Sequence, residues 1–175
     1  RTNLIEIYPR RGAIVSEMSA QQVRALFDTS ALMLGQIVHR IGETWRSHEA
    51  EALQHTMHYL VEQVKQGNTE KFYDGIFQFL AKQQDMVANP YLMKFYKELL
   101  PSIRRCYFLT LNTSRRELQE ALELIKLVID AILIRKSQQA TLFMDDFCRH
   151  LRNLVLESLA RMKQIELAWA RRSRR

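Results

Sequence analysis

Apolar residues recur at three- and four-residue intervals along most of this chain, and this spacing predicts amphipathic α-helices. Polar breaks divide the pattern into six stretches, at about 19–45, 47–66, 69–86, 90–107, 118–134 and 140–170. Because the breaks are short, consecutive helices are expected to run antiparallel to each other. The pattern therefore predicts an all-α fold, an antiparallel bundle of about six helices.

Residues that favour helix ends stand at several breaks: Ser19, Gly67-Asn68 and Asn89-Pro90. Pro101 falls inside the fourth stretch and is expected to kink that helix. The fifth stretch is almost entirely apolar over Leu122–Ile134, which predicts a central helix buried on several sides.

Residues 4–15 depart from the helical spacing. Two β-rich arms, Leu4–Tyr8 and Ala13–Val15, flank a turn that holds Pro9, Arg10, Arg11 and Gly12. Gly permits close backbone approach to a ligand, and two arginines at such a tip suit phosphate contact. The segment predicts a short β-ribbon with a basic tip. Since the chain opens on Arg1 without Met, we expect it to begin partway through a small β-containing domain.

Positive charge is concentrated at the two ends of the chain. The net charge is +7, and four arginines follow Ala170: Arg171, Arg172, Arg174 and Arg175. When the charges of this tail and of the basic ribbon are subtracted, the helical body is nearly neutral. We therefore do not expect the helical body to be a nucleic-acid-binding surface. We favour a solvated, disordered tail over a DNA-contacting arm for the C-terminal arginines.

Composition narrows the class of protein. The chain is 47% hydrophobic and 26% charged, as in ordinary soluble domains. No apolar run approaches the roughly 20 residues that span a bilayer, and no signal peptide is visible. Cys106 and Cys148 both fall in helical patterns, which favours buried, reduced thiols of an intracellular protein.

Enzyme chemistry finds little support. No Glu is followed three residues later by His, as di-iron bundles require, and the cysteines lack zinc spacing. There is no Gly-rich phosphate loop and no Ser/His/Asp arrangement in a strand-to-helix setting. The sequence therefore favours a protein that is not an enzyme.

Three polar residues stand on apolar stripes. Asp74 and Gln78 are one helical turn apart and share a face, and His150 precedes Leu151 on the last helix. These side chains would line a polar spot in the bundle. The alternatives are a wet helix face for Asp74 and Gln78, and a core histidine satisfied by one hydrogen bond for His150.

The segment Pro9–Ser16 resembles the wing of the winged-helix domain in GntR-family transcription regulators. The helices that follow resemble the FCD effector domain of the FadR-type subfamily, and the motifs that carry the likeness are Tyr73–Gln78, Asn89–Leu92, Ile103–Phe108 and Cys148–Leu151. The resemblance implies a cytoplasmic, homodimeric, DNA-binding transcription regulator. It divides the chain into a wing remnant (1–17), a helical ligand-binding and dimerisation domain (18–170) and a basic tail (171–175).

The resemblance also assigns roles to residues at both ends of the molecule. The wing residues Arg10, Arg11 and Gly12 would contact DNA, and operator DNA would be read by an N-terminal domain largely missing from this chain. A small organic acid or related metabolite would bind a central cavity. Ser30 and Leu34 stand where the family has Arg and Glu, which favours a more apolar metabolite. The candidate pocket residues are Asp74, Gln78, Arg105, Tyr107 and His150.

The family often binds a divalent metal beside its effector. Asp74 and His150 match two of the family's ligands, whereas Gln78 and Ile125 stand at the other two ligand positions. Phe147 is the alternative match for the last ligand. One carboxylate, one amide and one imidazole bind a divalent metal poorly, so we expect little metal affinity at this set.

Two functional hypotheses remain from different classes. The first is the effector and dimerisation domain of a transcription regulator. The alternative is a helical protein–protein interaction module without a small-molecule effector. The β-ribbon favours the first hypothesis, because a purely helical module has no use for it.

Overall fold

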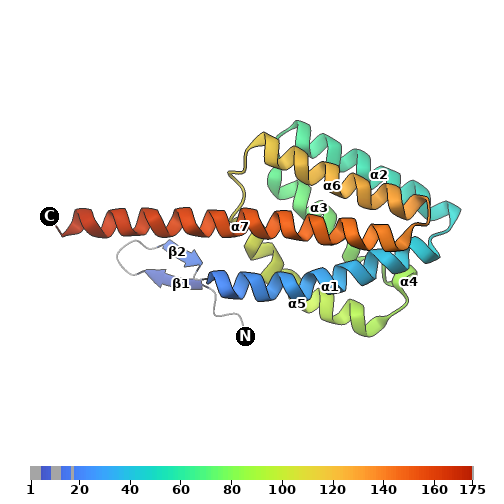
Figure 1. Ribbon diagram of the computed structural model, residues 1–175, viewed down its shortest axis with the longest axis horizontal. Coiled ribbons are helices and arrows are strands. Elements are labelled where there is room, and N and C mark those ends of the chain that lie inside the picture. The colour runs from blue at the N-terminus through green and yellow to red at the C-terminus, as the bar shows by residue number, and fades with distance from the viewer. Residues whose placement is uncertain (1–4, 9–12, 17, 175) are drawn as a thin grey trace.

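The computed structural model describes residues 5–8, 13–16 and 18–174. Its helical body consists of α1 (Ala20–Thr44), α2 (Ser47–Lys65), α3 (Thr69–Ala81), α4 (Gln84–Val87), α5 (Pro90–Phe108), α6 (Arg115–Leu133) and α7 (Ser137–Ser173) (Figure 1). In front of α1, strands β1 (Ile5–Tyr8) and β2 (Ala13–Ser16) pair antiparallel, with Ile5 opposite Ser16. The predicted all-α bundle is confirmed, with six long helices and one short helix among the described residues.

Helices α1 and α7 form the axis of the bundle and run antiparallel, with α2, α3 and α6 on one side and α4 and α5 on the other (Figure 1). Two glycines of α1 permit their close approach. A Cβ at Gly42 would lie 2.7 Å from Ser137 Oγ, and one at Gly35 would lie 3.1 Å from Thr141 Cγ2. Thr141 Oγ1 also donates a 3.0 Å hydrogen bond to the Gly35 carbonyl.

An aromatic cluster fills the interior between α3, α5 and α7. Tyr107 stacks on Tyr73 and on Phe77 with ring centroids 5.5 and 5.4 Å apart, and Phe147 lies 6.2 Å from both partners. All four side chains are buried. Tyr96 ties α5 to α3, because its hydroxyl donates a 2.8 Å hydrogen bond to the Phe77 carbonyl. Stacked aromatic rings of this kind stabilise beyond their buried area.

The helix ends follow local chemistry, as predicted. Ser19 caps α1 in a reciprocal capping box with Gln22. Asn68 and Asn89 accept hydrogen bonds from the first turns of α3 and α5. Gly67 has φ +69°, the left-handed conformation that ends a helix without steric cost. Helix α5 continues through Pro101, and the kink expected at this residue stays a prediction.

Three expectations for the helices were wrong. The third helix ends at Ala81, and Met86 belongs to the short α4. Helix α6 packs against α1, α2 and α7 but is not enclosed by them, because one stripe of the helix remains in solvent and leaves Leu127 42% exposed. The disordered tail expected from residue 171 onward does not begin there, since α7 remains helical to Ser173 and includes Arg171 and Arg172, while Arg175 lies outside the described residues. The predicted turn at 9–12 lies outside the described residues.

Arg135 locks the turn between α6 and α7 onto the end of α1. This residue has φ 59°, and its guanidinium donates to the carbonyls of Gly42 (3.2 Å), Glu43 (3.3 Å) and Trp45. The guanidinium also lies 4.2 Å from the Trp45 ring centroid. Helix carbonyls at a C-terminus favour a cation, so one side chain satisfies the end of α1 and fixes the turn.

Candidate functional site

Asp74 is the centre of a polar contact between α3 and α5. The Tyr107 hydroxyl donates a hydrogen bond to Asp74 Oδ1, and Arg104 Nε lies 3.3 Å from the same oxygen. Arg104 also extends toward Glu70, at 3.9 Å. Burial first, and then the hydrogen bond with Asp74, raise the pKa of Tyr107, so this hydroxyl stays protonated as a donor.

Asp74 and Gln78 share one face of α3, as their spacing predicted, and both line one hollow. It is a shallow depression of about 550 Å³ between α2 and α3, and its other lining residues are His55, Thr56, Tyr59, Gly75, Phe79 and Lys82. Gln78 is exposed and Asp74 is half-buried. The depression therefore presents a carboxylate, an amide and an ammonium group to solvent. Tyr107, Arg105 and His150 do not line it.

His150 lies in a different cluster. Its Nε2 is 3.0 Å from Glu117 Oε2 and 3.5 Å from Glu120 Oε2, and its side chain is only 16% exposed. The sequence reasoning missed both glutamates. They belong to the first two turns of α6. Acidic residues are common there because they interact favourably with the helix dipole, so their presence in the sequence does not indicate a binding site.

The residues implied by the family do not assemble a metal centre. Among the described residues, three side chains with metal-binding atoms come together: Glu117, Glu120 and His150. Asp74 does not belong to this group. Ile125 lines an apolar pocket of about 30 Å³ that is too small for a metabolite. Phe147 is part of the aromatic cluster. Neither side chain has a ligand atom, so the set expected from the family does not fit a divalent ion.

Two further polar groups are buried without partners among the described residues. The Tyr73 hydroxyl makes no hydrogen bond there, and burial together with the Glu117 carboxylate raises its pKa. The Nη1 atom of Arg105 is likewise buried and has no hydrogen-bond partner among the described residues. Buried polar groups cost free energy when they stay unpaired, so these positions are points where a ligand or water would be stabilised.

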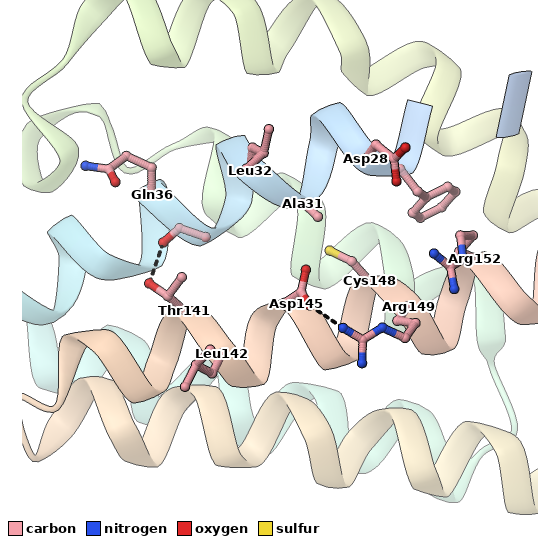
Figure 2. A pocket seen from close by; sticks show the side chains of 12 residues that line it. Asp28, Ala31, Leu32, Gln36, Thr141, Leu142, Asp145, Cys148, Arg149 and Arg152 are labelled. Atoms are coloured by element: carbon pink, nitrogen blue, oxygen red, sulfur yellow. Dashed lines mark hydrogen bonds and ion pairs between the residues drawn. The ribbon is translucent and has the colours of Figure 1, made fainter. Parts of the chain in front are cut away.

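A groove runs along the α1/α7 face, and none of the predicted pocket residues lines it. Its volume is about 600 Å³. Figure 2 shows Asp28, Ala31, Leu32 and Gln36 on one wall and Thr141, Asp145, Cys148 and Arg149 on the other. Leu32 is 78% exposed and Leu142 is 63% exposed.

The sequence model that describes the FCD-domain family matches residues 25–153 of this chain. The chain belongs to the FCD-domain family. The family resemblance seen in the sequence is thereby confirmed, and FCD domains are parts of GntR-family transcription regulators, which are not enzymes. No curated protein matches the chain in sequence.

Solved structures show the same fold at low sequence identity. E. coli McbR/YncC is 16% identical, with a TM-score of 0.65 over 94% of this chain and 74% of its own. Lar of Listeria monocytogenes is 12% identical, with a TM-score of 0.64 over 88% and 73%. Streptococcus agalactiae GntR is 14% identical, with a TM-score of 0.63 over 86% and 75%. These likenesses establish the fold alone.

The FCD match covers every candidate pocket residue. Its range contains Asp74, Gln78, Arg105, Tyr107 and His150, and also both walls of the α1/α7 groove. It ends at residue 153, so the last two dozen or so residues, with most of the exposed end of α7, lie beyond the matched FCD range.

Proposed function

We propose that this chain is the effector-binding and dimerisation part of a FadR-type transcription regulator of the GntR family. Residues 18–170 form the effector domain, and residues 1–17 belong to the wing of a winged helix that binds operator DNA through Arg10, Arg11 and Gly12. The FCD match over residues 25–153 carries the proposal. The antiparallel ribbon directly before α1 supports it, because this is where a wing would enter the effector domain.

The fold offers a route from an effector to DNA. Helix α1 begins next to the ribbon and runs along the bundle, where it packs against α4, α5, α6 and α7 (Figure 1). An effector changes operator affinity only if it binds one arrangement of the regulator better than another. A ligand that shifts the packing around α1 would therefore move the two wings of a dimer relative to each other.

The hollow beside Asp74 is the effector site that the geometry favours. Lys82 and Gln78 offer donors to a carboxylate, and Asp74 accepts from a hydroxyl or an amine. A small hydroxy acid or amino acid carries both kinds of group. The expected apolar metabolite gains no support from this polar lining. Tyr107 and Arg104 hold Asp74 in place and would transmit its displacement to α5.

A thermal-shift panel of hydroxy acids, amino acids and apolar acids tests this site on the chain itself. We expect a hydroxy acid or an amino acid to raise the unfolding temperature of the wild type. Asp74→Asn and Lys82→Ala should abolish the shift, and Lys71→Ala, exposed on α3, should keep it. A shift that survives both pocket substitutions would place the effector elsewhere. The absence of any shift across the panel would favour the alternative of a protein–protein interaction module.

The α1/α7 face is the surface that best fits a second copy of the chain. Leu32 and Leu142 expose two large aliphatic side chains on opposite walls of the groove. Asp28 and Asp145 stand beside Arg149 and Arg152, so the patch carries both signs of charge. A two-fold interface must be complementary to itself, and a patch of balanced charge around aliphatic side chains satisfies that condition. We therefore place the homodimer interface here.

A regulator of this kind acts on chromosomal DNA, and we accordingly place the protein in the cytoplasm. Within the described part of the chain, no helix combines the length and the apolar character needed to cross a membrane.

A further inference from the structure

Three side chains capable of binding a metal converge where the start of α6 meets the middle of α7. Glu117 and Glu120 project from the first turns of α6, and His150 faces them from α7. One ligand atom from each lies within 4.8 Å of the others. This trio shares only His150 with the set that the family resemblance implied, and it includes neither Asp74 nor Gln78.

The spacing of these atoms suits one divalent ion. His150 Nε2 is 3.0 Å from Glu117 Oε2 and 3.5 Å from Glu120 Oε2. Ligand atoms about 2.0–2.2 Å from a tetrahedral zinc lie roughly 3.3 Å from one another, so an ion requires only small adjustments. Two carboxylates also balance the charge of a divalent cation.

The second carboxylate is already oriented by a neighbour. Arg116 Nε donates to Glu120 Oε1 at 3.3 Å, which leaves Glu120 Oε2 directed toward His150. Arg116 is largely exposed, so its charge is screened by solvent and opposes a bound cation only weakly.

An independent observation comes from the interior side of the cluster. The Tyr73 hydroxyl belongs to a fully buried side chain and has no hydrogen-bond partner among the described residues. Its ring packs against Phe147, which lies one helical turn before His150 on α7, with the ring centroids 6.2 Å apart. Water held by a cation at the trio is the kind of group that would pair with such a hydroxyl. Without a ligand, this buried polar group stays unsatisfied at a cost in stability.

We propose that Glu117, Glu120 and His150 form a binding site for a divalent transition-metal ion, with water in the remaining position. Imidazole favours zinc and its transition-metal neighbours, and two carboxylates extend the range to manganese. The site links α6 to α7 beside the aromatic cluster. It is independent of the effector hollow at Asp74 and does not rest on the proposed regulatory function.

Calorimetric titration of the chelator-treated chain with Zn²⁺ and with Mn²⁺ tests the site. We expect one ion per chain for at least one of the two metals. Glu117→Gln, Glu120→Gln and His150→Asn should each weaken binding by at least about 10-fold. The controls Glu123→Gln on the outer face of α6, His55→Asn on α2 and Asp74→Asn should leave the affinity unchanged. Thermal unfolding of each variant checks that it is folded. Glu120, whose side chain is 42% exposed against 37% for Glu117 and 16% for His150, is the position where a substitution disturbs the core least.

Two results would overturn the site. One is the absence of stoichiometric binding of either ion. The other is binding that His55→Asn weakens and Glu120→Gln does not, which would assign the ion to a surface histidine. As a second readout, the visible spectrum of the Co²⁺-loaded chain should show low-coordinate cobalt and should lose that signature in Glu117→Gln.

Discussion

The hydroxyl of Tyr107 on α5 donates a hydrogen bond to the carboxylate of Asp74 on α3. The same ring stacks on Tyr73 and Phe77, so a single side chain joins the aromatic interior to the polar contact that orients Asp74. The candidate effector hollow and the core are therefore coupled through one residue. Mutations at this residue are expected to affect both stability and effector binding.

Tyr107→Phe removes this hydrogen bond and keeps the stacked ring. We expect it to lower the free energy of unfolding by about 1–2 kcal/mol, because a partly buried hydrogen bond to a carboxylate is lost. Urea denaturation at neutral pH measures the change. Tyr59→Phe, at a 44% exposed tyrosine, is the matched control and should be near neutral. Equal effects of the two substitutions would show that the bond contributes nothing to stability.

Arg135 combines a strained backbone with a clamp on the end of α1. Arg135→Ala loses the clamp and keeps the left-handed conformation, so we expect a loss of about 2–3 kcal/mol. Arg135→Gly loses the same contacts but relieves the strain, and it should be about 1 kcal/mol more stable than the alanine variant. Chemical denaturation ranks the variants, with Lys136→Ala as the neutral reference. If the alanine variant were more stable than the glycine variant, the left-handed backbone at residue 135 would not be strained.

Burial raises the pKa of the Cys106 and Cys148 thiols to about 12 each. The unfolded chain ionises these thiols near pH 9, so the folded state binds more protons above that pH. Stability should therefore fall as pH rises from about 9 toward 12, by the order of 1 kcal/mol per thiol between pH 8 and pH 10. Denaturation at the two pH values measures this fall. The double variant Cys106→Ala/Cys148→Ala should lose less stability between the two pH values than the wild type. An equal loss of stability in the double variant would show that the two thiols do not cause the fall.

The proposed dimer face makes a prediction about oligomeric state. Leu32→Asp or Leu142→Asp would bury a charge without a partner at the interface, and we expect either to convert a dimer into a monomer. Light scattering coupled to size-exclusion chromatography measures the mass. Tyr91→Asp, at a 74% exposed position at the start of α5, should remain dimeric. Dimers that persist in both leucine variants would place the interface on another face.

Local chemistry explains which parts of the fold were predictable from the sequence. Ser19, Asn68 and Asn89 satisfy backbone groups of their own helices, so their capping roles depend only on neighbouring residues. The break after Ala81 depends on distant contacts instead. Thr44 Oγ1 donates a 2.7 Å hydrogen bond to the Met86 carbonyl, so α1 holds α4 in place. No local pattern around residue 86 encodes that contact.

The arrangement of the candidate site residues was also predictable only in part, for a similar reason. Asp74 and Gln78 line one hollow because i,i+4 spacing fixes a shared helix face. The partners of His150 were missed, because the pairing of α6 with α7 sets which glutamates it meets. The exposure of Leu142 was also unpredictable from spacing, since a residue beside a core stripe becomes a groove wall only once α1 is packed against α7.

The most direct test of the central proposal is the affinity for operator DNA with and without effector. A protein that carries this chain together with its winged-helix domain would be titrated, by fluorescence anisotropy, against DNA from upstream of its own gene and against random DNA. The proposal predicts tighter binding to the upstream DNA, and a change of at least about 5-fold when the metabolite identified by thermal shift is added. Equal affinity for both DNAs, or an operator affinity that the metabolite leaves unchanged, would contradict it.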